Sequence, residues 1–483
     1  MFAFLTASDR SDQGLEPEVR IAEATPADLV RTTDLGLGID VEVDLADPER
    51  WRSVSVHRWD ETDLVLLEAV IGPDAVRRIG QRRADLLASG LPHVESELSV
   101  EFTPARPWRR IAVIDALDWW LQLPLDQALL DAERAVVRAQ AAKSLPVGLL
   151  RGDLTDQALV LARRSAEGLA DYLTELTESV SSLPRALFSG LSHLVNGYAT
   201  LGREVDGPDD ELGSVAHAWQ SLKAAVPVVA TFKLPDHSVT YRLSDKLISG
   251  SVALASSVDP RQLRARIVDT DVRAQEIRMV MSQEGSAVRV IVPAFGSHRQ
   301  SAVLADRLMV RLVDNRSGAA HEPVLLTLRS GREAERLGVR TPVFTEVVPL
   351  HGAPLEYLRA DVFDPDSEAT PARTDTDGAL LRQRRAQFVL GEWRRAAAEA
   401  RLSRGQKVRY RRLARLVDVL TQTSADADEP VFLGGPTPAE IRQLIERTGV
   451  ESPAPTAGHR WFTSVEGAGD LLVAELAAVH ANR

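Results

Sequence analysis

The spacing of apolar residues changes along this 483-residue chain, and that change limits the folds open to it. From about residue 116 to 228 the apolar side chains recur every three or four positions, which is the period of an α-helix. From about 229 to 363 they alternate with polar ones, which is the period of a strand with one buried face. Helices and strands with one buried face each need a partner layer of their own. The two patterns together therefore predict an α+β protein of several domains.

The first 115 residues mix the two patterns and are predicted to form a mixed α/β domain. Five stretches are apolar or alternate and predict strands: Met1–Ala7, Val19–Ala22, Ile39–Leu45, Ser53–His57 and Leu98–Phe102. Thr25 precedes a proline and lies three residues before Asp28, so a helix is expected to begin there. A second helical stretch covers 63–88. From Val19 onward the order is strand, helix, strand, strand, helix, strand, which matches a ferredoxin-like βαββαβ arrangement, with the strand at Met1–Ala7 as an extra element.

The middle of the chain predicts two further domains. Residues 116–228 contain long amphipathic stretches joined by short loops, as expected of a helical bundle. Thr155 is expected to cap one of these helices, and Pro184 to begin the next. Residues 229–363 contain alternating stretches joined by glycine-containing turns, which favours an antiparallel β-sandwich.

The last part of the chain begins with an acidic stretch at 364–378, which has no large apolar side chain and is expected to be a linker or loop. Helical patterns resume over 379–483 and define a C-terminal helical region, in which Thr437 and Glu440 have the spacing of a capping box. Within it, residues 382–415 carry twelve Arg or Lys and two carboxylates. The segment has a net charge of +10, whereas the whole chain has −12.

A basic segment on an acidic chain is expected to bind something acidic. The acidic group can belong to the protein itself, to a protein partner or to nucleic acid, and the sequence leaves these three interpretations open. The candidate binding side chains are the arginines beside the apolar stripe of the segment: Arg382, Arg384, Arg385, Arg394, Arg395, Arg409, Arg411, Arg412 and Arg415.

Motifs for catalysis or for a cofactor are weak or missing. The chain has no Cys, which excludes disulfides, thiolate metal sites and cysteine nucleophiles. None of its five Lys follows a Gly, so a Gly-Lys phosphate-binding loop is excluded. No two of its ten His lie three to five residues apart, as a helical metal pair requires. Gly36-Leu37-Gly38 lacks the third glycine of a dinucleotide fingerprint and is expected to be a turn that ends a helix.

These observations predict a non-catalytic interaction or scaffold protein without a metal or cofactor, which binds protein partners within a multi-protein assembly. The preference for Arg over Lys is typical of a GC-rich bacterial genome, and a signalling or defence operon is a guess that no residue supports. Since no stretch is typical of a signal peptide or a membrane span, we expect a cytoplasmic location. Two alternatives remain: a nucleic-acid-associated protein that uses 382–415, and an enzyme with a carboxylate site assembled across domains.

Overall fold

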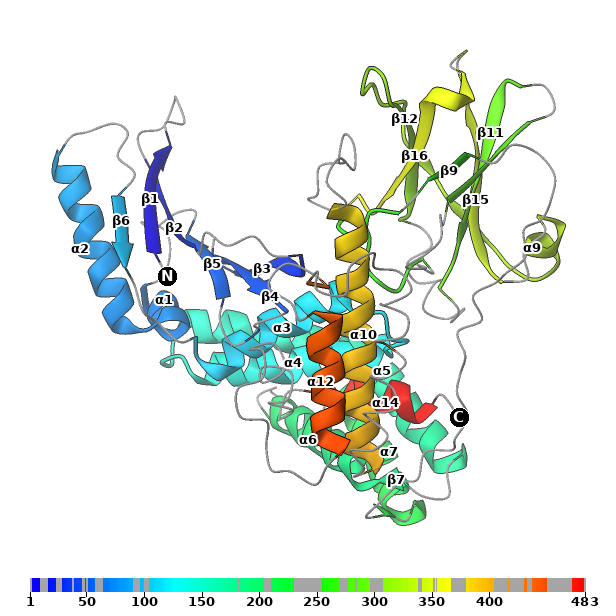
Figure 1. Ribbon diagram of the computed structural model, residues 1–483. Helices are drawn as coiled ribbons and strands as arrows, with labels where there is room; N and C mark the ends of the chain where they lie inside the picture. Colours follow the sequence, from blue (N-terminus) through cyan, green and yellow to red (C-terminus); the bar gives the residue numbers. More distant parts are fainter. Residues whose placement is uncertain are drawn as a thin grey trace.

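The protein is a mixed helix and sheet structure, described here by a computed structural model (Figure 1). The structure describes residues 2–8, 16–22, 28–36, 39–45, 48, 51–56, 64–89, 96–99, 104–179, 183–203, 210–226, 228–229, 254–256, 258–268, 277–282, 285–295, 307–337, 341–350, 352, 354–365, 379–403, 416, 430–431, 437–449 and 471–481. Within these ranges it has eleven α-helices and three antiparallel sheets of six, five and three strands, with one additional parallel strand pair.

The six-stranded sheet is built almost entirely before the first helix of the chain. Its elements follow one another as β1 (Phe2–Ser8), β2 (Glu16–Ala22), β3 (Val30–Gly36), β4 (Ile39–Asp44), β5 (Trp51–Val56), α1 (Leu64–Ile71), α2 (Pro73–Ser89) and β6 (Ser96–Ser99). The strand order across the sheet is β3-β4-β5-β2-β1-β6, and every neighbouring pair is antiparallel. Helices α1 and α2 are separated at Gly72, as the sequence predicts for 63–88.

The ferredoxin-like expectation for residues 1–115 is wrong, because the helix predicted to follow Thr25 is a strand. Val30–Gly36 forms β3, which pairs antiparallel with β4 after a gap of two residues. Gly36, the first residue of the predicted turn, therefore ends a strand rather than a helix, and Leu37 and Gly38 lie outside the described residues. Thr32 and Thr33 are β-branched and lose side-chain freedom in a helix, and the neighbouring strand offers them a pleated surface instead.

Most of the helices gather in one region of the molecule, below the sheets in Figure 1. They are α3 (Arg106–Trp120), α4 (Gln127–Lys143), α5 (Leu149–Ser179), α6 (Arg185–Leu201), α7 (Asp210–Ala225), α10 (Ala379–Ser403), α12 (Pro438–Gly449) and α14 (Val473–Ala481). One buried apolar cluster runs from Leu29 beside the six-stranded sheet to Val479 in α14. Helix α3 spans the predicted domain boundary between residues 115 and 116, and the division into domains stays a prediction.

Two further predicted helix starts, at Pro184 and at Thr155, have opposite outcomes. Pro184 lies immediately before α6, as predicted, and also belongs to β7 (Leu183–Pro184), which pairs in parallel with β8 (Val228–Val229). Thr155, however, lies inside α5, which begins at Leu149. Its hydroxyl donates back to the carbonyl of Arg151 at 2.8 Å, a bond that Thr makes within a helix, so the prediction of a cap there is wrong.

The remaining strands form the five-stranded and three-stranded sheets. The first contains β9 (Leu254–Ser256), β10 (Ile277–Met281), β11 (Ala287–Pro293), β14 (Thr327–Arg329) and β15 (Val343–Pro349); the second contains β12 (Met309–Asp314), β13 (Val324–Leu325) and β16 (Leu358–Phe363). β10 and β11 pair antiparallel, as their alternating residues predict. Val290 of the first sheet and Leu312 of the second belong to one buried cluster. A short helix, α9 (Arg332–Arg336), places Ala334 beside Ile291 in a small separate cluster.

Two predicted segments fall largely outside the described residues. Alternating residues also predict a strand near Val239–Leu243, which lies there entirely, and so does most of the predicted linker at 364–378. Of its two described residues, Asp364 is 2% exposed and its backbone N–H donates to the carbonyl of Gln262 at 2.9 Å, whereas Pro365 is exposed.

Close packing of α4 against α6 depends on Gly197, and its replacement gives a first prediction. A Cβ atom at Gly197 would overlap the side chain of Val136, whereas a Cβ at Gly213 in α7 would meet no atom within 4 Å. We expect Gly197→Ala to lower the unfolding free energy by about 1–3 kcal/mol because the helices must move apart. The matched variant Gly213→Ala should raise it by about 0.5–1 kcal/mol, since Ala favours a helix over Gly. Urea unfolding followed by circular dichroism would measure both, and equal shifts would contradict the packing argument.

Candidate functional site

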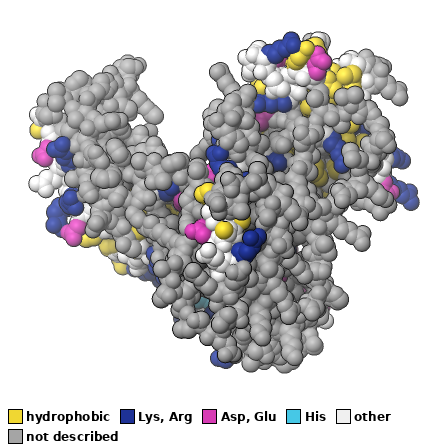
Figure 2. Space-filling view, viewed as in Figure 1, with side chains coloured by type: hydrophobic (Ala, Val, Ile, Leu, Met, Phe, Trp, Pro, Cys, Tyr) yellow, Lys and Arg dark blue, Asp and Glu magenta, His cyan; other side chains and the backbone are white. Residues whose placement is uncertain are grey.

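Helix α10 contains five of the nine candidate arginines. Arg382 is half-buried and four others are buried in α10, at 5–7% exposure: Arg384, Arg385, Arg394 and Arg395. The other four candidates lie outside the described residues: Arg409, Arg411, Arg412 and Arg415. On the face shown in Figure 2, the described Lys and Arg side chains lie in several separate groups.

The buried arginines of α10 contact other parts of the same chain. Arg394 donates from Nε and Nη2 to the two carboxylate oxygens of Glu475, at 2.6 and 2.7 Å. Arg384 donates from Nε and Nη2 to the carbonyl of Val258, at 3.2 and 2.7 Å. Arg395 lies 3.6 Å from a carboxylate oxygen of Glu399 one turn further along. Arg384 and Arg394 therefore hold α10 to other segments of the chain, whereas Arg395 pairs within α10 itself. The burial of these side chains leaves little surface for an external acidic partner.

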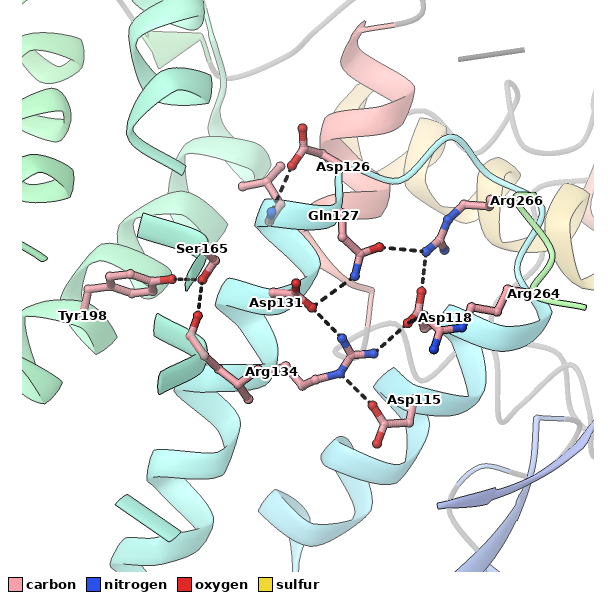
Figure 3. A network of polar contacts seen from close by, with 12 residues as sticks. Asp115, Asp118, Asp126, Gln127, Asp131, Arg134, Ser165, Tyr198, Arg264 and Arg266 are labelled. Atoms are coloured by element: carbon pink, nitrogen blue, oxygen red, sulfur yellow. Dashed lines mark hydrogen bonds and ion pairs between the residues drawn. The ribbon is translucent and has the colours of Figure 1, made fainter. Parts of the chain in front are cut away.

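A dense cluster of charged side chains lies where α3 ends, and Figure 3 shows it from close by. It combines side chains from α3, from α4 and from the segment 258–268 that leads to the five-stranded sheet. The members are Asp115, Asp118, Gln127, Asp131, Arg134, Arg264 and Arg266. Sequence analysis alone does not identify this cluster.

Arg134 is bound on three sides by carboxylates. Its Nε donates to Asp115 at 2.7 Å, its Nη1 to Asp131 at 2.7 Å and its Nη2 to Asp118 at 2.9 Å. Burial alone would lower the pKa of Arg134, but the charges of these three carboxylates raise it above its ordinary value. A planar guanidinium group with donors in several directions suits this arrangement, which a single ammonium group could not reproduce.

Asp118 is shared between α4 and the segment 258–268. Besides Arg134, it accepts a hydrogen bond from Nη2 of Arg266, and Arg264 lies 4.0 Å away. Nη2 of Arg266 also lies 3.4 Å from the side-chain oxygen of Gln127. Burial would raise the pKa of Asp118, but Arg266, Arg134 and Arg264 together hold it well below its ordinary value. The carboxylate is therefore ionised at neutral pH.

The two residues after Asp118 contact further parts of the molecule. The backbone N–H of Ala265 donates to the carbonyl of Trp119 at 2.8 Å. The guanidinium group of Arg31 in β3 lies 3.9 Å from the centre of the Trp119 ring, within the range of a cation–π contact. Nε1 of Trp120 donates to the carbonyl of Val30, also in β3, at 3.0 Å. We call Asp118, Trp119 and Trp120 the α3 joint.

The segment 258–268 connects the α3 joint to the two smaller sheets. Leu263 and Ile267 belong to the same buried cluster as the strands of these sheets. The carbonyl of Ile267 accepts from the N–H of Phe295, which follows β11, at 3.0 Å. Three consecutive residues at the end of α3 thus contact the six-stranded sheet, helix α4 and the segment that enters the smaller sheets.

Comparison with known proteins does not identify a function for this cluster. No model of a protein family matches the chain, and neither the curated proteins nor the solved structures contain a match. Function is therefore inferred from the residues and their geometry.

The described residues contain neither a metal-binding cluster nor a membrane-spanning helix. Among them, no group of three or more His, Asp or Glu side chains is arranged to hold a metal ion. None of the helices in the described part of the chain has the length and apolar character needed to cross a membrane.

The sequence indicates the charged cluster at the end of α3 only weakly. Asp115 and Asp118 interrupt an otherwise apolar run, and Asp131 stands three residues before Arg134 on a helix rich in alanine. Charged residues on such faces indicate buried ion pairs. Arg266, however, is 148 residues from Asp118, so no local pattern links the two.

The ion pairs of Asp118 predict a loss of stability in acid. Because its folded pKa lies below the ordinary value of 3.8, the ionised carboxylate contributes stability that is fully present above about pH 5. That contribution is lost as the pH falls through the unfolded pKa toward the folded one. Asp118→Asn should lower the unfolding free energy at neutral pH and lose less than the wild type on acidification, as measured by urea unfolding across the pH range. Parallel pH profiles for the two proteins would rule out this role.

Proposed function

We propose that the protein is a non-catalytic scaffold that binds protein partners within a cytoplasmic bacterial assembly. The observation that carries the proposal is the α3 joint, where Asp118, Trp119 and Trp120 contact three parts of the chain at once. Partner surfaces on different parts of a protein act together only when those parts are held in fixed relative positions. A buried joint with several ion pairs and hydrogen bonds supplies that constraint.

The proposal includes a finer architecture. The helices that surround α14 would act as a bundle, and the two smaller antiparallel sheets would act as a β-sandwich. The shared buried cluster of the two sheets, with Val290 and Leu312 as members, supports the second assignment. Together with the six-stranded sheet, these units would offer separate surfaces for partners.

The electrostatics of the joint support a structural role over acid–base chemistry. A general acid or base works best with a pKa near the operating pH. The pKa of Asp118 is held far below neutrality by Arg266, Arg134 and Arg264, against the effect of burial, and that of Arg134 is raised. Neither group gains or loses a proton near neutral pH, as expected of groups that hold a fixed structure.

Affinity purification of the tagged full chain from its native host at low and high salt tests the proposal. A stoichiometric protein partner that remains bound at high salt would support a scaffold. Co-purification of nucleic acid that is lost at high salt, and lost after replacing Arg409, Arg411 and Arg412 by Ala, would favour the nucleic-acid alternative instead. A chain that carries no partner and turns over a small molecule would overturn the proposal.

A further inference from the structure

Helix α14 is enclosed by the rest of the chain. Every residue from Leu472 to His480 is at most 6% exposed, and the helix contacts α4, α6 and α10. Figure 1 shows it among these helices. It is nine residues long, and isolated helices of that length are marginal in water. The surrounding helices therefore provide a binding site that stabilises α14.

The start of α14 is bound by charged side chains of two other helices. One carboxylate oxygen of Glu133 in α4 accepts from the backbone N–H groups of Val473 and Ala474, at 2.7 and 3.4 Å. These N–H groups have no partner within their own helix, and a negative charge at this end is favourable. Arg110 in α3 lies 3.3 Å from the other oxygen of Glu133 and donates to the carbonyl of Leu471 at 3.2 Å.

A third charged residue, Arg394 in α10, binds a side chain of α14. Its two parallel hydrogen bonds to Glu475 form a forked pair in which Glu475 is completely buried. The same carboxylate accepts from the N–H of Leu472 at 2.7 Å, as in a helix cap. The Arg394 contact therefore selects a helix with a carboxylate at this position.

The fit is also steric. A Cβ atom at Gly190 in α6 would lie 2.9 Å from Cγ2 of Val473, so only glycine leaves room for the valine. We call Arg110, Glu133, Gly190 and Arg394 the α14 socket. Its members come from four helices and lie against the backbone at the start, a carboxylate and a methyl group of one short helix.

None of these contacts requires that helix and socket belong to the same molecule. Twenty-three residues separate Gly449 of α12 from Val473, and a connection of that length can span up to about 80 Å. We propose that the α14 socket also binds α14 of a second copy of the chain, so that two chains associate by exchanging this helix. The proposal names a partner for the scaffold and in that sense rests on the proposed function.

A tethered helix has an effective concentration in the millimolar range, so docking within one chain dominates in dilute solution. Exchange is therefore tested with chains in which internal docking is weakened. The natural chain has no Cys, so a single introduced thiol can pair only with another introduced one. The ideal Cβ at Gly190 lies 3.6 Å from Cβ of Val473, a separation that suits a disulfide.

The test mixes two full-length chains with different tags, one carrying Gly190→Cys and the other Val473→Cys. In the first chain the added side chain crowds its own Val473, which weakens internal docking, whereas the smaller side chain at position 473 of the second chain relieves that contact. We expect mild oxidation of the mixture to give a disulfide between positions 190 and 473 of different chains, identified by mass spectrometry. Adding Glu475→Arg to the second chain should reduce its yield at least tenfold, because the incoming helix then meets Arg394.

The control is one chain with both Gly190→Cys and Val473→Cys, which should close an internal disulfide and so verify the geometry. If that chain closes but the mixed chains give no 190–473 link, helix exchange is wrong. A 190–473 disulfide whose yield is unchanged by Glu475→Arg would also contradict helix exchange, because the two thiols would then meet by random collision. Capture of another protein as a stoichiometric partner by wild-type chain would leave the scaffold proposal standing in either case.

Discussion

Replacing Arg394 by Met is expected to lower the free energy of opening helix α14 by about 3–5 kcal/mol. The substitution leaves Glu475 fully buried with its forked partner gone, and an uncompensated buried charge is far more costly than the pair itself. Hydrogen exchange of peptides that cover Val473–Ala481 measures this local opening directly. Their protection should fall by about two to four orders of magnitude, while the strands of the smaller sheets keep theirs.

Two controls separate the buried pair from a general effect of losing an arginine. Arg77 forms an ion pair with Asp74 in which both side chains are mostly exposed, at 72% and 85%. Arg77→Met should therefore change stability by less than about 1 kcal/mol. The double variant Arg394→Met/Glu475→Leu removes both charges and should recover much of the lost protection. If the double variant opens as readily as the single one, shape rather than charge decides the docking of α14.

Arg134→Met is expected to cost a similar amount, about 3–5 kcal/mol, but at a different place. Three carboxylates within 2.9 Å of its nitrogens would lose their shared cation, although Asp118 would keep Arg264 and Arg266 nearby. The loss should appear as a lower urea midpoint of the helical region.

Arg134→Lys is the matched variant for that experiment. It keeps the positive charge but offers one ammonium group where the site has donors in three directions. Its stability should fall between those of the wild type and Arg134→Met. A lysine variant as stable as the wild type would mean that charge alone, without the directional hydrogen bonds, holds the cluster together.

Such buried ion pairs contribute more to fixing one arrangement of the chain than to the free energy of unfolding. Well-packed apolar replacements of a buried pair are often neutral or stabilising, so pairs of this kind are weak evidence for stability. At the α3 joint, however, one carboxylate binds arginines from α4 and from the segment 258–268, and a shifted arrangement would leave charges unpaired. The joint therefore favours one arrangement of the chain, as the proposed scaffold requires.

Elements that depend on nearby residues could be predicted from the sequence. The pattern over 125–143 predicts α4, observed at Gln127–Lys143, and Pro184 marks the start of α6. Thr437 and Glu440 form the expected capping box, with N–H to side-chain oxygen distances of 3.1 and 2.8 Å. Helical periodicity and caps involve groups within four residues of each other, so the order of residues is sufficient to specify them.

Only the tertiary structure decided which charged residues pair and whether ambiguous segments form a helix or a strand. Residues 30–36 became a strand because β4 lies beside them, despite the helix signal at Thr25. The arginines of α10 look like an exposed basic face in the sequence, yet Arg394 is buried against Glu475, 81 residues away. Asp118 meets Arg266 across 148 residues. Sequence by itself determined where helices and most strands form, since those depend on local geometry; which charges meet depends on how distant segments pack, and only the folded chain brings them together.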